Sequence, residues 1–153
     1  MVAAQWEGRI GPPPGSERES PRVAASRETR NVDRALRRYF AGQVAVLGEI
    51  PIHAEGTSFQ RAAWKVLRRV PPGATITYTE LAARAGHSGA PRAAGQANSA
   101  NPVSLVIPCH RAVGLDGALV FYGGGIARKR WLLDHEARSA PDPRPCRRAG
   151  SRI

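Results

Sequence analysis

One segment carries an unbroken helical repeat of apolar residues, and it constrains the fold more than any other stretch of this 153-residue chain. Between Phe59 and Val70 the apolar positions recur at spacings of three and four, which predicts a helix with one face in a core. Thr57 and Gln60 form a capping box at its start, and Pro71-Pro72-Gly73 ends it. The apolar face consists of Phe59, Ala62, Ala63, Val66, Leu67 and Val70. Trp64 falls near the edge of this face, which favours a structural role for its ring over stacking on a nucleobase.

The next segment contains the signals of two short helices joined by a turn. Residues 74–76 predict a strand, and Thr77 with Glu80 forms a second capping box for a helix that runs to Ala85. A glycine-containing turn follows, and another helix is predicted over residues 92–99. Two short helices separated by a turn are typical of a helix-turn-helix.

The second of these helices carries almost no side-chain bulk at Ala93, Ala94, Gly95 and Ala97. Few of its side chains can read base edges in the wide major groove, whereas a slim helix with one arginine suits close approach to a narrower groove. The same composition is also typical of a helix packed tightly inside a core. The sequence leaves both interpretations open.

The residues that carry chemistry follow a β-branched apolar run. Residues 103–107 predict a buried strand that ends at a proline, and Cys109, His110 and Arg111 come next. A neighbouring imidazole or guanidinium lowers the pKa of a thiol toward the nucleophilic thiolate. On an extended chain Cys109 and His110 point to opposite faces, so a tight turn or one bridging water has to carry the proton. The alternative is that Cys109 is a small buried hydrophobe.

Two further residues are candidates to support this cysteine. Asn101 precedes a proline and favours a turn, so its side chain is a candidate for bracing the cysteine loop. Glu136 falls on the apolar face of a predicted C-terminal helix, where a carboxylate needs a hydrogen-bonding partner. His110 is the candidate partner, because a carboxylate on one ring nitrogen strengthens the other nitrogen as a base. The alternative is a glutamate frayed into solvent at a helix end.

The remaining segments have weaker signals. Residues 114–117 predict a hairpin turn, residues 119–122 a returning strand, and the glycines at 123–125 either a close approach of the backbone to a ligand or a flexible joint. Residues 1–30 and 137–153 are rich in Pro, Arg, Ser or Glu and are predicted to be disordered.

Between the first of these tails and the long helix, the sequence predicts one short amphipathic helix and a connector. Asn31 or Asp33 caps the helix, Gly42 ends it, and residues 43–56 form an extended connector. Its apolar face consists of Val32, Ala35, Leu36, Tyr39 and Phe40.

Composition limits the function classes. The formal charge of +11, nearly all from arginine, favours a polyanionic partner such as nucleic acid, unless much of it lies in disordered tails. No apolar run is long enough to span a membrane and no signal peptide follows Met1, so a cytoplasmic location is expected. Cys109 and Cys146 form no disulfide framework or metal-ligand spacing, and Cys146 is interpreted as incidental.

Taken together, these segments resemble the O6-alkylguanine-DNA alkyltransferases, the methylated-DNA–protein-cysteine methyltransferases. The family signature Pro-Cys-His-Arg stands at residues 108–111. The resemblance runs from about Gly56 to Glu136 through Gly56-Thr57-Ser58-Phe59-Gln60, Thr77-Tyr78-Thr79-Glu80-Leu81-Ala82, Arg92-Ala93-Ala94-Gly95, Asn101-Pro102, Tyr122-Gly123-Gly124-Gly125 and Trp131-Leu132-Leu133-Asp134-His135-Glu136. Several motifs in the same order make it far more specific than any one of them.

The resemblance implies a mixed, mostly helical α/β fold. Its core is a winged-helix-like DNA-binding domain with a helix-turn-helix, the alkyltransferase domain at residues 56–136. A helix and connector at residues 31–55 are the remnant of a larger N-terminal α/β domain. Ala112 replaces the valine that commonly follows the signature arginine, and the tail after Glu136 matches nothing in the family.

The resemblance also implies a site. Cys109 matches the alkyl acceptor, His110 its water-mediated base, Glu136 the acid that orients the base, and Asn101 the residue that organises the backbone. Tyr78 matches a proton donor to guanine N3. Arg92 matches the arginine finger that binds DNA, with Ala93, Ala94 and Gly95 beside it. The positions that match the surroundings of the guanine are Ala112, Tyr122 and Gly123, together with the carbonyl of Cys109.

The implied activity is direct-reversal DNA repair. One methyl or alkyl group passes from O6-alkylguanine, with O4-alkylthymine as a further candidate, to Cys109, and each molecule acts once. The implied partner is double-stranded DNA, bound through the minor groove by a monomer with the damaged base flipped out. No metal or organic cofactor is implied, and the location is the nucleoid, or the nucleus in a eukaryote.

Three other functions compete with this one. A non-catalytic alkyltransferase-like protein typically has another residue, often tryptophan, in place of Cys109. A helix-turn-helix transcriptional regulator needs base-reading side chains, which residues 92–99 scarcely supply. A cysteine hydrolase would turn over repeatedly and needs an acyl substrate pocket.

Overall fold

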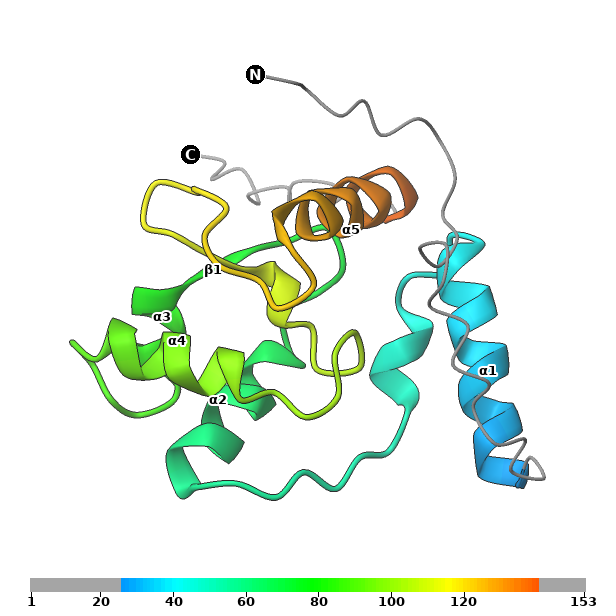
Figure 1. Ribbon diagram of the computed structural model, residues 1–153, viewed down its shortest axis with the longest axis horizontal. Helices are drawn as coiled ribbons and strands as arrows, with labels where there is room; N and C mark the ends of the chain where they lie inside the picture. The colour runs from blue at the N-terminus through cyan, green and yellow to red at the C-terminus, as the bar shows by residue number, and fades with distance from the viewer. Residues whose placement is uncertain (1–25, 141–153) are drawn as a thin grey trace, which may run out of the picture.

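The computed structural model describes residues 26–140, which form a mostly helical fold with one small sheet (Figure 1). The expected mixed, mostly helical fold class is confirmed. Along the chain the elements are α1 (Arg27–Phe40), the 3₁₀-helix η1 (Val46–Glu49), α2 (Ser58–Leu67), β1 (Ile76–Thr77), α3 (Tyr78–Arg84), α4 (Pro91–Ser99), the 3₁₀-helix η2 (Cys109–Arg111), β2 (Ala112–Val113) and α5 (Ile126–Ser139).

Helix α2 is the centre of the main core. Its capping box is present, with the Gln60 amide donating to Thr57 Oγ1 at 3.2 Å and the Thr57 amide donating to Gln60 Oε1 at 2.8 Å. Trp64 is buried rather than at the edge of the helix face, and its indole N–H donates to the Ala97 carbonyl at 2.8 Å. The expected structural role of Trp64 is thus confirmed.

Helices α3 and α4 pack against each other and against α2 (Figure 1). The second capping box is also present, because the Glu80 amide donates to Thr77 Oγ1 while the Glu80 carboxylate accepts from the Thr77 amide. On α4, Ala94 and Ala97 are fully buried in the core, whereas Arg92 stays exposed. One face of this helix therefore packs in the core, as the second interpretation held, and its other face remains open.

The sheet consists of two short parallel strands. Ile76 pairs with Ala112 and Thr77 pairs with Val113, which places the start of α3 beside the end of η2. The observed β1 lies slightly later in the chain than the predicted strand at residues 74–76.

Two of the predicted strands are wrong. Residues 103–107 form turns with one isolated bridge, and Leu105 has a positive φ of 72°. The cause is local, since Asn101 Oδ1 accepts from the Val103 amide at 3.0 Å and Asn101 Nδ2 donates to the Ile107 carbonyl at 2.8 Å. Residues 119–122 have no partner strand either, although the predicted turn before them closes through the Gly114 amide and the Ala118 carbonyl at 2.8 Å.

The predicted limits of the tails also need correction. Helix α1 begins at Arg27, inside the segment expected to be disordered, because Ser26 rather than Asn31 or Asp33 is its cap and accepts from the Thr29 amide. The expected extended connector contains η1, and α5 continues to Ser139, beyond the predicted start of the C-terminal tail. Residues 1–25 and 141–153, with Cys146, lie outside the described residues.

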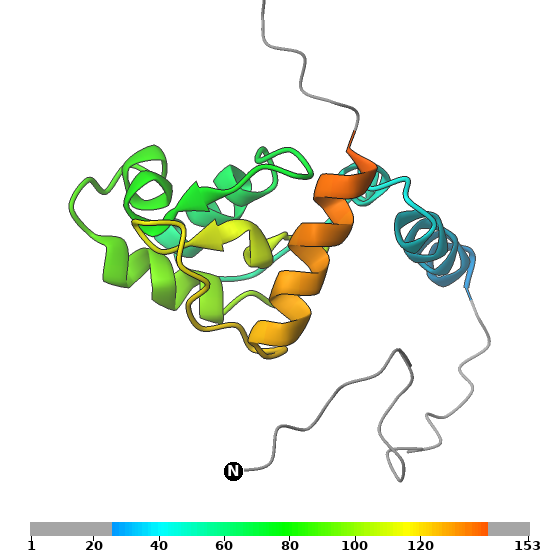
Figure 2. The ribbon, with the colours of Figure 1, turned by 90° about the horizontal axis from the view of Figure 1, so that it is seen from above.

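A second, smaller core joins the N-terminal segment to the last helix. Figure 2 shows α5 between α1 and the group formed by α2, α3 and α4. This core consists of Ala35, Tyr39, Val44, Val46, Leu47 and Leu132, with Leu105 and Tyr122 packed against it. The N-terminal segment therefore contacts the loop that leads to Cys109. Within residues 26–140, none of the helices has the length and apolar character needed to cross a membrane.

Replacing Trp64 with Phe tests the link between α2 and α4. The substitution keeps a buried aromatic ring but leaves the Ala97 carbonyl without its donor, so we expect a loss of about 1–3 kcal/mol in the free energy of unfolding. Urea unfolding measures it. The control Lys65→Ala changes an exposed side chain of the same helix and should stay within about 0.5 kcal/mol of the wild type. Equal losses in the two variants contradict this account.

Candidate active site

The signature cysteine lies in a single turn of 3₁₀-helix rather than on an extended chain. Pro108 precedes η2, and the Cys109 amide donates to the Ile107 carbonyl at 2.8 Å. The premise of alternating side chains at Cys109 and His110 is therefore wrong. Cys109 is 5% exposed and His110 is fully buried, so both side chains face the interior of the protein.

A single carboxylate, that of Glu136, holds this turn to α5. Its Oε1 accepts from His110 Nε2 at 2.9 Å, from Arg111 Nη2 at 2.7 Å and from the Tyr39 hydroxyl at 2.8 Å. Its Oε2 accepts from Arg111 Nε at 2.9 Å and from the Gly73 amide at 3.3 Å. The expected pairing of Glu136 with His110 is confirmed, and the alternative of a glutamate frayed into solvent is wrong, because this side chain is fully buried.

These contacts fix the protonation states of the pair. Burial by itself would raise the pKa of Glu136, but the hydrogen bonds and charges of His110 and Arg111 prevail and lower it to about 2. Burial lowers the pKa of His110 below its usual value, against the opposing effect of Glu136. At neutral pH an ionised carboxylate therefore faces a neutral imidazole.

The geometry also assigns the tautomer of His110. Because Nε2 lies against a carboxylate, which can only accept, Nε2 carries the hydrogen and Nδ1 carries the lone pair. Nδ1 is buried and has no hydrogen-bond partner among the described residues. It is therefore the basic nitrogen of the site.

The surroundings of Cys109 have opposing effects on the pKa of its thiol. Burial raises its pKa, whereas hydrogen bonding to the side chains of Asn101 and Ser104 and the positive charge of Lys129 lower it. The net direction is upward, so Cys109 rests as a neutral thiol. A nucleophilic role for this sulfur therefore requires a base.

Two tyrosines lie close enough to Cys109 to be affected by the negative charge that its thiolate form carries. Burial first, and then the charge of Cys109, raises the pKa of Tyr78, and the same two causes raise the pKa of Tyr122 to about 12. Both phenols therefore keep their protons at neutral pH. The Tyr78 hydroxyl also accepts from Asn98 Nδ2 at 3.3 Å.

Two residues in this region were not predicted from the sequence. Lys129 is fully buried, and its ammonium donates to the carbonyls of Ala112 at 2.6 Å and Val120 at 3.1 Å. Asn98 Nδ2 lies 3.3 Å from the carbonyl oxygen of Cys109 as well as from Tyr78. Lys129 could have been found from its spacing, since it is seven residues before Glu136 and so lies on the same helix face.

The residues predicted to bind DNA or a base have different positions. Arg92 and Gly123 are exposed, and Ala93, Gly95 and Tyr122 are partly exposed. Ala94 and Ala112 are fully buried, so the side chain of Ala94 packs in the core and Ala112 can offer only its backbone. The carbonyl of Cys109 already accepts from Asn98 Nδ2 and from the Ala112 amide, and the carbonyl of Ala112 accepts from the Lys129 ammonium.

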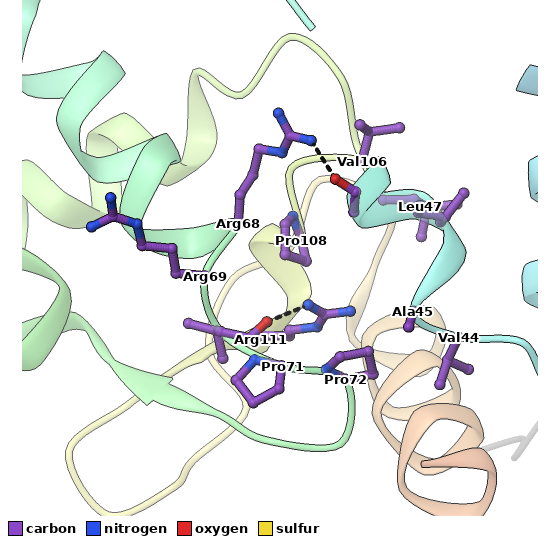
Figure 3. A pocket seen from close by; sticks show the side chains of 13 residues that line it. Val44, Ala45, Leu47, Arg68, Arg69, Pro71, Pro72, Val106, Pro108 and Arg111 are labelled. Atoms are coloured by element: carbon purple, nitrogen blue, oxygen red, sulfur yellow. Dashed lines mark hydrogen bonds between the residues drawn. The ribbon is translucent and has the colours of Figure 1, made fainter. Parts of the chain in front are cut away.

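A small cavity of about 100 Å³ lies behind the cysteine turn (Figure 3). Pro108 and Arg111 line it together with residues of η1 and of the segment that follows α2. Arg68 spans this region by donating to the Gly48 carbonyl at 2.8 Å, and Arg111 donates to the Val70 carbonyl (Figure 3). Cys109 is not among the residues that line this cavity.

In residues 26–140, no three His, Cys, Asp or Glu side chains are grouped so that they could hold a metal ion.

The sequence matches a family model described as 6-O-methylguanine DNA methyltransferase, DNA binding domain, over residues 58–138, more than half of the chain. The chain belongs to this family. The match to the methyltransferase family begins at the first residue of α2 and ends one residue before the end of α5, so α1 and η1 lie before it.

Relatives and solved structures agree with this membership. A methylated-DNA–protein-cysteine methyltransferase from Shigella flexneri is 48% identical over 101 residues, which cover 66% of this chain and 59% of the relative. One from Mycobacterium tuberculosis is 45% identical over 106 residues, covering 69% and 64%. The chain thus spans about three fifths of the length of these relatives. A crystal structure of Mycobacterium tuberculosis OGT in complex with DNA superposes with a TM-score of 0.68 at 41% identity, covering 74% of this chain and 70% of that chain.

Because the pKa of Glu136 is low, the free energy of unfolding should decrease in acid. A carboxyl group with a pKa of about 2 in the folded protein and 4.5 ordinarily contributes stability above pH 4.5, which is lost as the pH falls toward 2. The difference corresponds to about 3 kcal/mol. We expect Glu136→Gln to lower the free energy of unfolding by several kcal/mol at pH 7, because it leaves Arg111 buried without its counter-charge. Between pH 4.5 and 2, the free energy of unfolding of this variant should change less with pH than that of the wild type.

Urea unfolding at a series of pH values measures this profile. Asp134→Asn, an exposed position on the same helix, is the matched control and should keep the wild-type loss of stability in acid. A Glu136→Gln profile as steep as that of the wild type would show that another group causes the loss.

Proposed function

We propose that this protein is a direct-reversal DNA repair protein that accepts the methyl or alkyl group of O6-alkylguanine on Cys109. The single observation that carries the proposal is the buried constellation of Cys109, His110 and Glu136, in a chain of the 6-O-methylguanine DNA methyltransferase family. The relatives named methylated-DNA–protein-cysteine methyltransferase support the same reaction.

The proposed step is a displacement at the alkyl carbon. The sulfur of Cys109 forms a bond to that carbon while the bond from carbon to O6 breaks, and its electron pair stays with the base. The thiol proton passes through one water to Nδ1 of His110, and Tyr78 donates a proton to N3 of the guanine, so the base leaves neutral. Because a thioether is not readily displaced by the repaired guanine, each molecule acts once.

The electrostatics described above suit this step. The resting thiol is neutral, so proton removal has to accompany attack, and the neutral imidazole of His110 has its lone pair on Nδ1. Lys129 places a positive charge near the sulfur as negative charge develops on it. Asn101 holds the loop before the cysteine, and Asn98 holds the carbonyl of Cys109. None of these roles requires a metal or an organic cofactor.

The proposed partner is duplex DNA, bound by the protein as a monomer. Helices α3 and α4 form the proposed helix-turn-helix, and the small residues Ala93 and Gly95 let α4 approach the minor groove closely. Residues 26–140 hold 16 of the 23 Lys and Arg residues and 8 of the 12 Asp and Glu residues, so +8 of the total charge of +11 belongs to the described region. This charge favours the phosphate backbone.

The damaged base has to leave the stack to reach Cys109, a residue that is only 5% exposed. Arg92, exposed at the start of α4, is the candidate for filling the space that the base vacates. The carbonyls of Cys109 and Ala112, with the amide of Gly123 and the side chain of Tyr122, are the candidates for reading the guanine edge. O4-alkylthymine is a second candidate substrate, and a DNA partner implies location at the nucleoid, or in the nucleus of a eukaryote.

Mass spectrometry tests the alkyl acceptor directly. Incubation with duplex DNA that contains O6-methylguanine should add one methyl group per protein molecule, on the peptide that contains Cys109. Cys109→Ala should abolish the gain because it removes the sulfur, while Cys146→Ser should retain it. Repeated turnover, or an unmodified Cys109 after the methyl has left the DNA, favours a hydrolase or another acceptor and refutes the proposal.

Arg92→Ala tests the role of α4. We expect it to slow transfer from duplex DNA by about 10- to 100-fold, the equivalent of about 1–3 kcal/mol, because the vacated space in the duplex is no longer filled. Transfer from a free O6-alkylguanine base should change little, since no duplex has to open. Arg84→Ala, an exposed arginine of α3, is the control. Equal slowing with duplex and free base would contradict this role.

A further inference from the structure

A hydroxyl group from the N-terminal helix reaches the buried carboxylate of the site. Tyr39 stands in the last turn of α1, before the segment that matches the family model, and 97 residues away from Glu136 in the sequence. Its hydroxyl donates to Glu136 Oε1 at 2.8 Å, and its side chain is 1% exposed. Helix α1 therefore contributes a polar group to the same oxygen atom that binds His110.

The position of this hydroxyl is fixed by packing at the end of α1. His135, the neighbour of Glu136 on α5, lies with its Nε2 2.8 Å from the Tyr39 carbonyl oxygen. The rings of Tyr39 and His135 meet edge to face with centroids 5.3 Å apart, and Phe40 packs on Trp131 with centroids 6.0 Å apart. The last turn of α1 is thus held to α5 by a backbone contact and by two ring contacts, which restrict the position of the Tyr39 hydroxyl.

The hydroxyl can only donate to Glu136. Burial and the negative charge of Glu136 raise the pKa of Tyr39 far above neutral pH, so the phenol keeps its hydrogen. Oε1 then accepts three hydrogen bonds, from Tyr39, His110 Nε2 and Arg111 Nη2. Donors on one oxygen compete for its electron density, and each of them restricts the rotation of the carboxylate.

We propose that Tyr39 is a positioning residue for alkyl transfer: its hydroxyl fixes Glu136 Oε1 and thereby sets the orientation and proton-accepting strength of the His110 imidazole. Tyr39 touches neither the sulfur nor the substrate and acts through Glu136. The effect of Tyr39 on the rate of alkyl transfer rests on the function proposed above, whereas its effect on the pKa of His110 does not. The other charged groups that act on His110 are Glu136, Arg111 and Lys129, and all three remain in a Tyr39 variant.

Tyr39→Phe removes the hydroxyl and keeps the ring. With one donor fewer, the carboxylate of Glu136 binds an imidazolium more strongly, so the pKa of His110 should rise by about half a pH unit. The titration of the His110 ring is measured by NMR of protein labelled with ¹⁵N-histidine. The acid limb of the rate of methyl transfer should move to higher pH by the same amount. In this single-turnover assay the rate constant reports the chemistry, while the amplitude reports only the fraction of folded protein.

Phe40→Leu is the matched control. It loosens the same turn of α1, through the contacts with Trp131 and His135, but it removes no hydrogen bond from Glu136. We expect it to lower the unfolding temperature and leave the titration of His110 unchanged. If Tyr39→Phe lowers stability without moving that titration, or if Phe40→Leu moves it equally, the hydroxyl is merely structural and the proposal is overturned. A wild-type protein that transfers no methyl group would refute the proposed function, but the two titrations would still decide the role of Tyr39.

Discussion

A fully buried carboxylate, that of Glu136, is the interaction on which this structure depends. An ionised carboxyl group removed from water is strongly destabilising unless hydrogen bonds and opposite charge compensate for it. Here the compensation comes from three other parts of the chain: Tyr39 in α1, Gly73 in the turn after α2, and His110 with Arg111 in η2, all of them gathered around α5. The same contacts that compensate for the buried charge of Glu136 therefore hold the N-terminal segment, the cysteine turn and the last helix together, so fold and site share one set of bonds.

The network also separates the tasks of the neighbouring groups. Arg111 keeps Glu136 ionised, which lets the carboxylate hold Nε2 of His110 and leaves the lone pair on Nδ1. Burial keeps both the imidazole and the Cys109 thiol neutral at rest. Lys129, on the same face of α5 as Glu136, ties the helix to the strand after the cysteine turn and adds positive charge near the sulfur.

Elements whose signals are local could be predicted from the sequence. The helices at α2 and α3 carry complete capping boxes, and the structure contains both, because a cap involves residues only three positions apart. The strand predicted at residues 103–107 failed for the opposite reason. A strand exists only where a partner supplies hydrogen bonds, and Asn101 offers that backbone a local alternative that no apolar pattern reveals.

The sequence by itself determined that a glutamate of the last helix faces the core and that a cysteine, a histidine and an arginine follow a proline, because helical periodicity and adjacency are written along the chain. It also carried the motifs that mark the family. Only the tertiary structure decided that Tyr39, Gly73 and Arg111 share this carboxylate with His110, that Lys129 and Asn98 hold backbone carbonyls beside the sulfur, and that α1 joins the site. Such contacts join residues up to 97 positions apart, and they depend on how whole helices pack, which no local pattern specifies.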